Sequence, residues 1–365
     1  MKRARGFSLV EVMVAMTLGL LVLGALLGLF AGTRTANRST TGIAGLTDGG
    51  RFALDFIGQA GRNAGFYACN NPQRLATTLN NGPTPLLYAF GNPVSGFEAT
   101  GTAPGSAVTL ALAPVTGDGN AGDWVAGLDA ALMGLAAGQP VKGSDVLVVY
   151  SSLPRTGAAA PVPVSVTGIA DGADNFQVNA PGQLATGQLA AISDCVKTVT
   201  FQITAFDGVN VFHDAAGFIP GNAGSAFPVS FSVGAQVMPV TATIYYIGVG
   251  ADGDGALYTR GLNGSGSWGA PVELVPDIEN MQILYGYDVN GDQTTYQYTT
   301  ADQVTTWSQV ASIRVAVLAA SAPGAAPIPT TATTYNLLGT TVTPALDSRI
   351  RQAFDTTITL RNSVP

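Results

Sequence analysis

One carboxylate lies at the start of a long apolar run near the N-terminus of this chain. Glu11 is followed by residues 12–33, which carry no charged side chain and are long enough to cross a bilayer as a helix. Because an ionised carboxylate is costly in hydrocarbon, such an acid marks a function and needs a cationic partner. The alternative is an interfacial side chain that reaches the headgroups. Glu11 is therefore the first candidate for chemistry.

A set of oxygen ligands lies late in the chain. Asp288, Asn290 and Asp292 alternate around a glycine, a pattern typical of calcium-binding loops. The position at which such a loop carries its bidentate glutamate is Thr299 here, and the similar stretch at 252–255 is poorer. An Asn-Gly pair also favours a type I′ hairpin turn. The pattern predicts either a calcium site, the single cofactor considered, or a turn.

The two cysteines, Cys69 and Cys195, are too far apart for a C-x-x-C redox or zinc motif. In an exported protein the expected arrangement is one disulfide, and two unpaired buried thiols are the alternative.

No enzymatic motif is present. His213 is the one histidine, which cannot build a multi-histidine metal site, and we expect it at the surface or in a turn. The sequence has no G-x-S-x-G, no H-E-x-x-H and no glycine-rich phosphate loop. Trp124 and Trp268 are set among glycines and could mark either a contact surface or the core. The chain is predicted not to be an enzyme.

Composition and charge restrict the partners. The 365 residues are 47% hydrophobic and only 11% charged, with a net charge of −7 and a pI of about 4.6. An acidic chain is poorly suited to neutralise a phosphate backbone, so nucleic-acid binding is disfavoured. Lys2, Arg3 and Arg5 precede the apolar run, which places the N-terminus in the cytoplasm and the remainder outside. A cleaved secretory signal is the alternative, but this run is longer than a signal h-region and begins with an acid.

The helix is expected to continue beyond the apolar run. A set of small and apolar residues recurs at steps of three and four, the spacing of one helical face: Ile43, Leu46, Gly50, Ala53, Ile57, Ala60 and Ala64. This pattern predicts an amphipathic continuation over residues 34–65 that packs on a sheet. Glycines at 42, 45, 49 and 50 favour a bend or local melting.

The remaining chain is predicted to be a large antiparallel β-rich domain over residues 66–365, so the fold class is α+β. Period-two alternation indicates half-buried strands at 198–203, 229–233 and 312–317. Further strand candidates cover residues 108–112, 145–150, 240–246 and 354–360. Tracts rich in glycine, alanine and proline near 114–140, 154–190 and 214–226 are predicted to be long loops.

The string Gly6-Phe7-Ser8-Leu9-Val10-Glu11, after a basic leader and before the apolar run, resembles the type IV prepilin signature. The resemblance implies that a prepilin peptidase removes residues 1–6 after Gly6 and methylates the new N-terminus at Phe7. It also implies a membrane-spanning and filament-core helix over residues 7–33, with Glu11 as the assembly glutamate. The amine of Phe7 in a neighbouring subunit could supply the cation that Glu11 needs. Small residues at 24, 28 and 32 would allow close helix packing.

Three further segments are similar to PilW-type minor pilins: 51–69, 273–286 and 356–362. The resemblance implies an inner-membrane subunit, with its C-terminal domain in the periplasm, that later joins a pilus on the cell surface. Its implied partners are the major pilin, other minor pilins in a tip complex that primes assembly, and a PilY-type adhesin. A type II secretion pseudopilin is one alternative. A membrane-anchored periplasmic binding protein or enzyme is another, of a different class.

Overall fold

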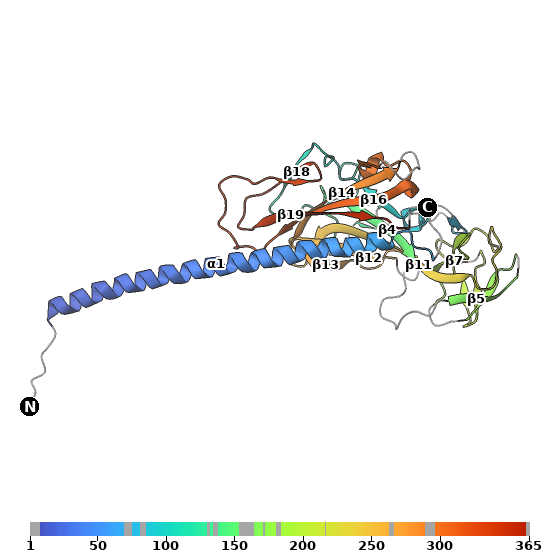
Figure 1. The fold of residues 1–365 in the computed structure, drawn as a ribbon, viewed down its shortest axis with the longest axis horizontal. Coiled ribbons are helices and arrows are strands. Elements are labelled where there is room, and N and C mark those ends of the chain that lie inside the picture. Colours follow the sequence, from blue (N-terminus) through green and yellow to red (C-terminus); the bar gives the residue numbers. More distant parts are fainter. Residues whose placement is uncertain are drawn as a thin grey trace, which may run out of the picture.

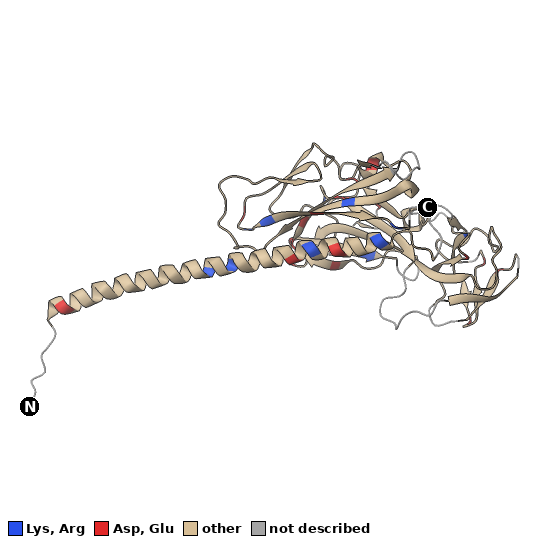
Figure 2. Ribbon diagram, in the orientation of Figure 1, with Lys and Arg blue, Asp and Glu red and all other residues tan. Residues whose placement is uncertain are grey.

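A long helix carries a β-rich body at its C-terminal end (Figure 1). The structure is a computed structural model that describes residues 8–68, 75–80, 85–129, 132–133, 138–152, 164–170, 172–179, 184–215, 217–262, 266–288 and 296–362. Helix α1 (Leu9–Asn63) has 55 residues and is therefore about 82 Å long. Figure 2 shows one acidic position near its start, followed by a long stretch without charge; in the sequence this stretch runs from Glu11 to Arg34. The predicted fold class, a long N-terminal helix followed by a β-rich domain, is confirmed.

The buried face of α1 follows the predicted spacing but begins later than expected. Its buried residues are Leu46, Gly50, Ala53, Ile57, Gly58 and Gly61. Ile43, the first residue of the predicted face, is instead 47% exposed. Full burial of the helix face therefore begins at Leu46, although the helix already contacts the body at Ser39.

The glycines of α1 do not interrupt it. The helix is continuous through residues 42–50, so the predicted local melting is wrong. Some of these glycines are required by close packing, because an added Cβ at Gly50 would lie 2.3 Å from the Phe354 ring. At Gly42 it would lie 2.7 Å from the Cβ of Ala325.

One antiparallel sheet packs directly on the second half of α1. Its order is β15 (Tyr296–Thr299), β14 (Ile278–Asp288), β16 (Val310–Ala320) and β19 (Arg351–Thr359). A smaller sheet covers part of its other face and comprises β17 (Tyr335–Leu337), β18 (Thr340–Pro344) and β3 (Ala107–Leu110).

The largest sheet has a body part and a distal part. The body part contains β2 (Val94–Phe97), β4 (Val146–Ser152), β11 (Gln236–Val249), β12 (Gly255–Gly261) and β13 (Val272–Pro276). Strand β11 connects the two parts, because residues 240–249 pair with β4 and β12 while residues 236–239 pair with β7 and β5.

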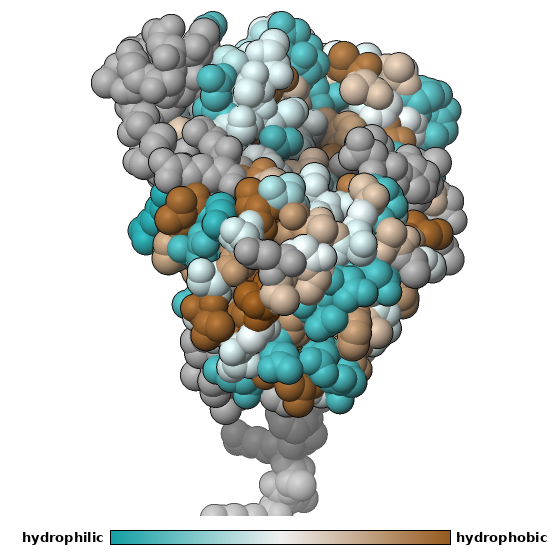
Figure 3. Space-filling model, turned by 90° about the vertical axis from the view of Figure 1, so that its right-hand side faces the viewer, coloured by the Kyte–Doolittle hydropathy of each residue, from teal (hydrophilic) through white to brown (hydrophobic). Residues whose placement is uncertain are grey.

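The distal part forms a lobe at the end of the molecule farthest from the N-terminus (Figure 1). Its strands are β1 (Leu75–Thr77), β5 (Val164–Ile169), β6 (Asn175–Val178), β7 (Leu189–Ser193), β8 (Thr198–Gln202), β9 (Ala205–Phe206) and β10 (Asn210–Phe212). The pairs β1–β8 and β3–β18 are parallel, which the antiparallel prediction did not include. Figure 3, which faces this end, shows small groups of apolar residues among polar ones. Three short 3-10 helices complete the described elements: η2 (Pro85–Tyr88), η5 (Ala301–Gln303) and η6 (Trp307–Gln309).

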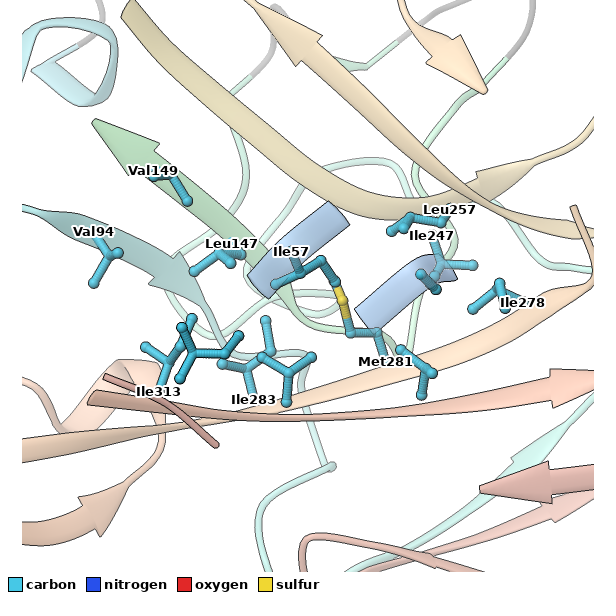
Figure 4. Packing of buried hydrophobic residues seen from close by; sticks show 14 of the residues in the cluster. Ile57, Val94, Leu147, Val149, Ile247, Leu257, Ile278, Met281, Ile283 and Ile313 are labelled. Atoms are coloured by element: carbon cyan, nitrogen blue, oxygen red, sulfur yellow. The ribbon is translucent and has the colours of Figure 1, made fainter. Parts of the chain in front are cut away.

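The main core lies where α1 meets the two larger sheets (Figure 4). Ile57 of α1 lies between Leu147 of β4 and Met281 of β14, and all three residues are 0% exposed. Full burial of a side chain of this size stabilises the fold by about 1.5–3 kcal/mol. The helix is thus held by the sheets on which it packs.

Most predicted strands are present, with two corrections. The prediction for 229–233 is wrong: this segment is irregular and pairs with no strand in the described part of the chain, and Phe231 anchors it in the lobe core. The prediction of half-buried strands is also wrong for β8 and β16, which are covered on both faces. In β8 the polar side chains are satisfied internally, because Gln202 Nε2 donates to the Gly187 carbonyl at 2.8 Å. The tract at 154–190, predicted as a loop, contains β5 and β6.

The structure decides between the two alternatives for the tryptophans and corrects the expectation for the histidine. Both tryptophans belong to the core, since Trp124 is 0% and Trp268 7% exposed. His213 is buried rather than at the surface, and its ring stacks on Phe227 with centroids 3.9 Å apart. Burial lowers the pKa of His213 to about 4. The imidazole is therefore neutral at physiological pH and belongs to the aromatic core of the distal lobe.

Candidate assembly site

The first half of α1 contacts nothing else in the described chain. Its large apolar side chains, from Leu9 to Phe30, are between 43% and 76% exposed. Length and composition make α1 capable of crossing a membrane. Thr17 and Thr33, the polar side chains inside the apolar run, donate to the carbonyls of Val14 and Leu29, each at 2.9 Å. The run therefore exposes hydrocarbon with its hydroxyls already satisfied.

Glu11 closes the N-terminus of this helix. Ser8 is the N-cap: its Oγ accepts from the Glu11 backbone N–H at 3.2 Å, and Glu11 Oε2 accepts from the Ser8 N–H at 2.9 Å. This reciprocal capping box satisfies two of the free donors at the helix end. The carboxylate thus has a local partner in the single chain, and one that donates only a neutral hydrogen bond. Gly6 and Phe7 lie outside the described residues.

Small residues leave one side of the exposed helix open. An added Cβ at Gly19, Gly24, Gly28 or Gly32 would meet nothing within 4 Å. Nothing within the described chain therefore requires glycine at these positions. Close approach of another helix would use them.

The second half of α1 is fixed to the body at several levels. Near the beginning of the contact, Ser39 Oγ donates to the Ala325 carbonyl at 2.5 Å. Beyond the helix end, Asn362 Nδ2 donates to the Ala64 carbonyl at 3.0 Å, and the Gly65 N–H donates to the Tyr150 carbonyl at 2.7 Å. The exposed half is thus a rod that projects from a firmly held base.

Asp145 joins the two larger sheets, a role that the sequence did not indicate. Its Oδ1 accepts from the Ala99 N–H at 2.9 Å and its Oδ2 from the Ile283 N–H at 2.8 Å. Ser144 reinforces the seam, since its Oγ accepts from the Met281 N–H at 3.0 Å. The carboxylate lies immediately before β4 and bonds to β14, so it holds together the two sheets that flank α1.

Glu98 lies beside this seam and is 4% exposed. Burial, together with the nearby carboxyl of Asp145, raises the pKa of Glu98 to about 9. Burial likewise raises the pKa of Asp145 to about 7. Glu98 is therefore protonated at neutral pH, which avoids two adjacent charges in the core.

Two arginines near the C-terminus organise the acids around them. Arg349 bonds to Asp254 and, at 2.7 Å, to Asp277. Arg351 bonds to Glu279 at 2.6 Å and to Asp347 at 2.6 Å. The network ties the start of β19 to the ends of β12, β13 and β14. One sequence signal could have indicated this ion-pair network: the charged residues Asp347, Arg349 and Arg351 alternate along the chain.

The network also changes the interpretation of the poorer calcium candidate. Oxygens of Asp252, Asp254 and Asp277 lie within 4.8 Å of one another, as a cation site would require. The Arg349 guanidinium is bonded to two of these three carboxylates and supplies the positive charge itself. The cluster therefore already contains a cationic partner for two of its three acids.

The structure does not test the remaining predicted calcium ligands or the pairing of the two cysteines. Asn290, Asp292 and the side chain of Asp288 lie outside the described residues, so the calcium site stays a prediction. Cys195 is disulfide-bonded, and Cys69, its expected partner, also lies outside the described residues. The pairing stays a prediction as well.

Comparison with known proteins gives matches at both ends of the chain. Residues 1–27 match the sequence profile of the prokaryotic N-terminal methylation motif, and residues 244–362 match that of type IV pilus-assembly protein W. The second range begins within β11 and includes two of the three PilW-like segments, while 51–69 lies outside both ranges. A solved type IV-like pilin from Thermus thermophilus is 17% identical, with 50% of this chain and 86% of that chain covered and a TM-score of 0.22. No curated protein matches the chain.

The two profile matches fit what the geometry presents. The methylation motif covers the capped, exposed start of α1, and the PilW match covers the sheets on which the second half of α1 packs. This chain therefore carries a prokaryotic N-terminal methylation motif at its start and a segment similar to type IV pilus-assembly protein W over its last third.

Proposed function

We propose that this chain is a minor pilin that helps to prime and assemble a type IV pilus after a prepilin peptidase removes residues 1–6. The observation that carries the proposal is the exposed apolar half of α1, with an acid at its start and a firmly attached β body at its other end. Such a rod is stable in lipid or against other apolar helices, and not in water.

Cleavage after Gly6 would create the chemistry that assembly needs. The freed amine of Phe7 in one subunit would lie at the depth of Glu11 in its neighbour. The amine is a charged donor, so its bond to the carboxylate adds an ion-pair attraction that the uncharged Ser8 N–H cannot supply to Glu11 Oε2. Assembly would thus exchange the internal cap for a contact between subunits, and that contact would set their axial register.

The PilW match supports, as proposed partners, those that the sequence resemblance implies. They are the major pilin, other minor pilins in a tip complex, and a PilY-type adhesin. Before assembly the subunit would cross the inner membrane once, with the basic leader in the cytoplasm and the β body in the periplasm. The role is structural, with no catalytic step beyond that of the peptidase.

The N-terminus of the mature chain tests this proposal. We expect mass spectrometry of the membrane fraction to find a chain that begins at a methylated Phe7, and immunoblotting of sheared pili to detect it. A chain that retains Met1 would overturn the proposal. A processed chain that is absent from pili and copurifies with type II secretion components would support the pseudopilin alternative.

A further inference from the structure

One loop of the body lies near the point at which α1 would leave a membrane. Residues 321–334 connect β16 to β17 without regular secondary structure. Figure 1 shows this loop at the end of the body that faces the exposed half of α1. Of the two ends of the body, the loop therefore lies at the one nearer to the apolar run.

The loop is attached to α1 a short distance beyond the apolar run. Ser39 Oγ donates to the Ala325 carbonyl at 2.5 Å, and an added Cβ at Gly42 would lie 2.7 Å from the Cβ of Ala325. As a helix, residues 12–33 measure about 33 Å, which matches the hydrocarbon thickness, and Ser39 lies about 9 Å beyond Thr33. The headgroup layer on each side is about 5–8 Å thick. The attachment is thus close to the outer edge of the headgroups.

The free part of the loop exposes an aliphatic side chain between two prolines. Ile328 is 65% exposed, and Pro327 and Pro329 are exposed as well. Ile328 follows Ala325 by three residues, a length of chain that reaches about 10 Å. This length is sufficient to return from the level of Ser39 to the end of the apolar run. Because proline has no backbone N–H, the tip brings few unsatisfied donors to an apolar boundary.

The charges around the loop are basic. The chain carries no charged residue from 315 to 346, and α1 carries Arg34 and Arg38, both exposed, just after the apolar run. The Arg34 guanidinium lies over the Phe30 ring, 5.3 Å from its centroid. The next acid along α1 is Asp48, about 15 Å farther from the run than Arg38. Figure 2 shows two basic positions on α1 near the level of the loop and no charged position on the loop itself. Basic groups at this level suit lipid phosphates.

We infer that the loop of residues 326–334 rests on the outer face of the bilayer that α1 crosses. Ile328 lies at the boundary between headgroups and acyl chains, and Arg34 and Arg38 bind lipid phosphates. Burial of an exposed aliphatic side chain in this boundary is favourable. The inference rests on the membrane-anchored stage of the proposed function and adds a second contact with the bilayer.

The base of the loop is held firmly enough for this contact to orient the body. The Gly324 N–H donates to Ser348 Oγ at 2.8 Å, and the Ala326 N–H donates to the Ser348 carbonyl at 3.0 Å. Together with the bond from Ser39, these contacts join the loop to both α1 and the segment before β19. A loop fixed in this way limits the tilt of the body on its helix, and the subunit leaves this contact when it leaves the membrane.

Quenchers carried by lipids test the contact in the full chain. The chain is purified from its native membrane and placed, without reduction, in nanodiscs of phosphatidylethanolamine and phosphatidylglycerol. An NBD fluorophore is attached to Ile328→Cys, and the matched control is Val233→Cys in the distal lobe, where Val233 is 66% exposed. We expect lipids with a nitroxide near the headgroup to quench the probe at 328 severalfold more than the probe at 233. Equal quenching at the two positions would overturn the inference.

A charge at the tip separates lipid contact from a structural effect. Ile328 is largely exposed, so Ile328→Asp should leave the thermal midpoint unchanged. In this variant, the quenching of a probe at Ala332, an exposed residue of the same loop, should fall to the level measured at Val233. Ile328→Leu should keep the quenching. Undiminished quenching in Ile328→Asp, or a probe that is protected only in assembled pili and not in nanodiscs, would assign the loop to another role.

The N-terminus distinguishes this inference from the proposed function. Mass spectrometry of the same preparation identifies the first residue, and immunoblotting of sheared pili detects the subunit. A chain that retains Met1 and still shows preferential quenching at 328 means that the proposed function fails while the loop contact holds. A chain that begins at a methylated Phe7 and enters pili, but shows equal quenching, means that only the loop contact fails.

Discussion

Two partners compete for the carboxylate of Glu11. In the single chain it accepts the Ser8 N–H, and in the proposed filament it would accept an ammonium group from a neighbour. The Ser8 N–H at the helix end can be satisfied by other groups, whereas an ionised carboxylate in hydrocarbon needs a cationic partner. The capping box therefore positions the Glu11 side chain and leaves its carboxylate able to bind the amine of a neighbouring subunit.

Substitution of Glu11 should affect assembly alone. For Glu11→Ala we expect normal membrane insertion and leader removal, and reduced incorporation into filaments, because the charge that pairs with the neighbouring amine is gone. Immunoblots of membranes and of sheared pili measure both. Ser8→Ala is the control: it breaks the capping box, at a cost of about 1 kcal/mol, and keeps the acid. If the two variants lose incorporation equally, the cap and not the charge is what matters.

Glu98 should make the stability of the body dependent on pH. Its pKa is about 9 in the folded chain against an ordinary 4.5, so the folded state binds the proton more tightly than the unfolded state. The resulting stabilisation is complete below about pH 4.5 and is lost as the pH rises through about 9. Asp145 contributes in the same direction.

The isosteric variant Glu98→Gln tests this dependence. We expect its stability to change less between pH 5 and pH 9, by several kcal/mol, because the amide cannot ionise. Thermal unfolding of the detergent-solubilised chain at both pH values is the measurement. Asp355→Asn, which removes an exposed carboxylate on β19, should leave the pH profile unchanged. Parallel profiles for the wild type and Glu98→Gln would contradict the assignment.

At the scale of elements, α1 has two halves with different packing requirements. The first half is exposed throughout, and the second half is held by β16 and β19 through close contacts at glycines. A glycine in a helix costs about 1 kcal/mol relative to alanine. Where the sheet approaches the helix backbone, this cost is offset by the packing that glycine permits.

Alanine substitutions at two glycines of α1 should therefore have opposite effects. Gly50→Ala would place a methyl 2.3 Å from the Phe354 ring, and we expect a loss of about 1–3 kcal/mol from overpacking. Gly45→Ala enters open space, and we expect a gain of up to about 1 kcal/mol. Thermal unfolding, with hydrogen exchange of the β19 amides, measures both. A stabilised Gly50→Ala would show that α1 does not approach β19 this closely.

At the scale of the whole molecule, β11 connects the distal lobe to the body and the predicted disulfide would add a second link. The link would join the segment that follows α1 to the turn between β7 and β8. Closing a loop of this size contributes on the order of 4–5 kcal/mol in the chain-entropy model.

Peptide mapping without reduction tests the disulfide. We expect a linked Cys69–Cys195 pair and, after Cys69→Ser, earlier proteolysis of the distal lobe than of the body, because the lobe would lose a covalent link to the segment that follows α1. Limited proteolysis followed by mass spectrometry measures the order of cleavage. Free thiols at both positions in the exported chain would refute the pairing.

The sequence by itself determined the N-terminal features of this protein. The apolar run, the acid at position 11 and the helical spacing from Leu46 to Ile57 depend on residues only a few positions apart, and a helix satisfies its backbone within the segment. The same locality explains why the strands at 198–203 and 312–317 could be predicted from alternation.

Only the tertiary structure decided which residues meet across long separations. Asp145 reaches Ala99 and Ile283, Arg349 reaches Asp254 and Asp277, and residues 229–233 fail to form a strand although they alternate. A strand requires a partner, and a buried acid requires donors. Each comes from a distant segment, whose position depends on how the whole chain packs and not on any local pattern.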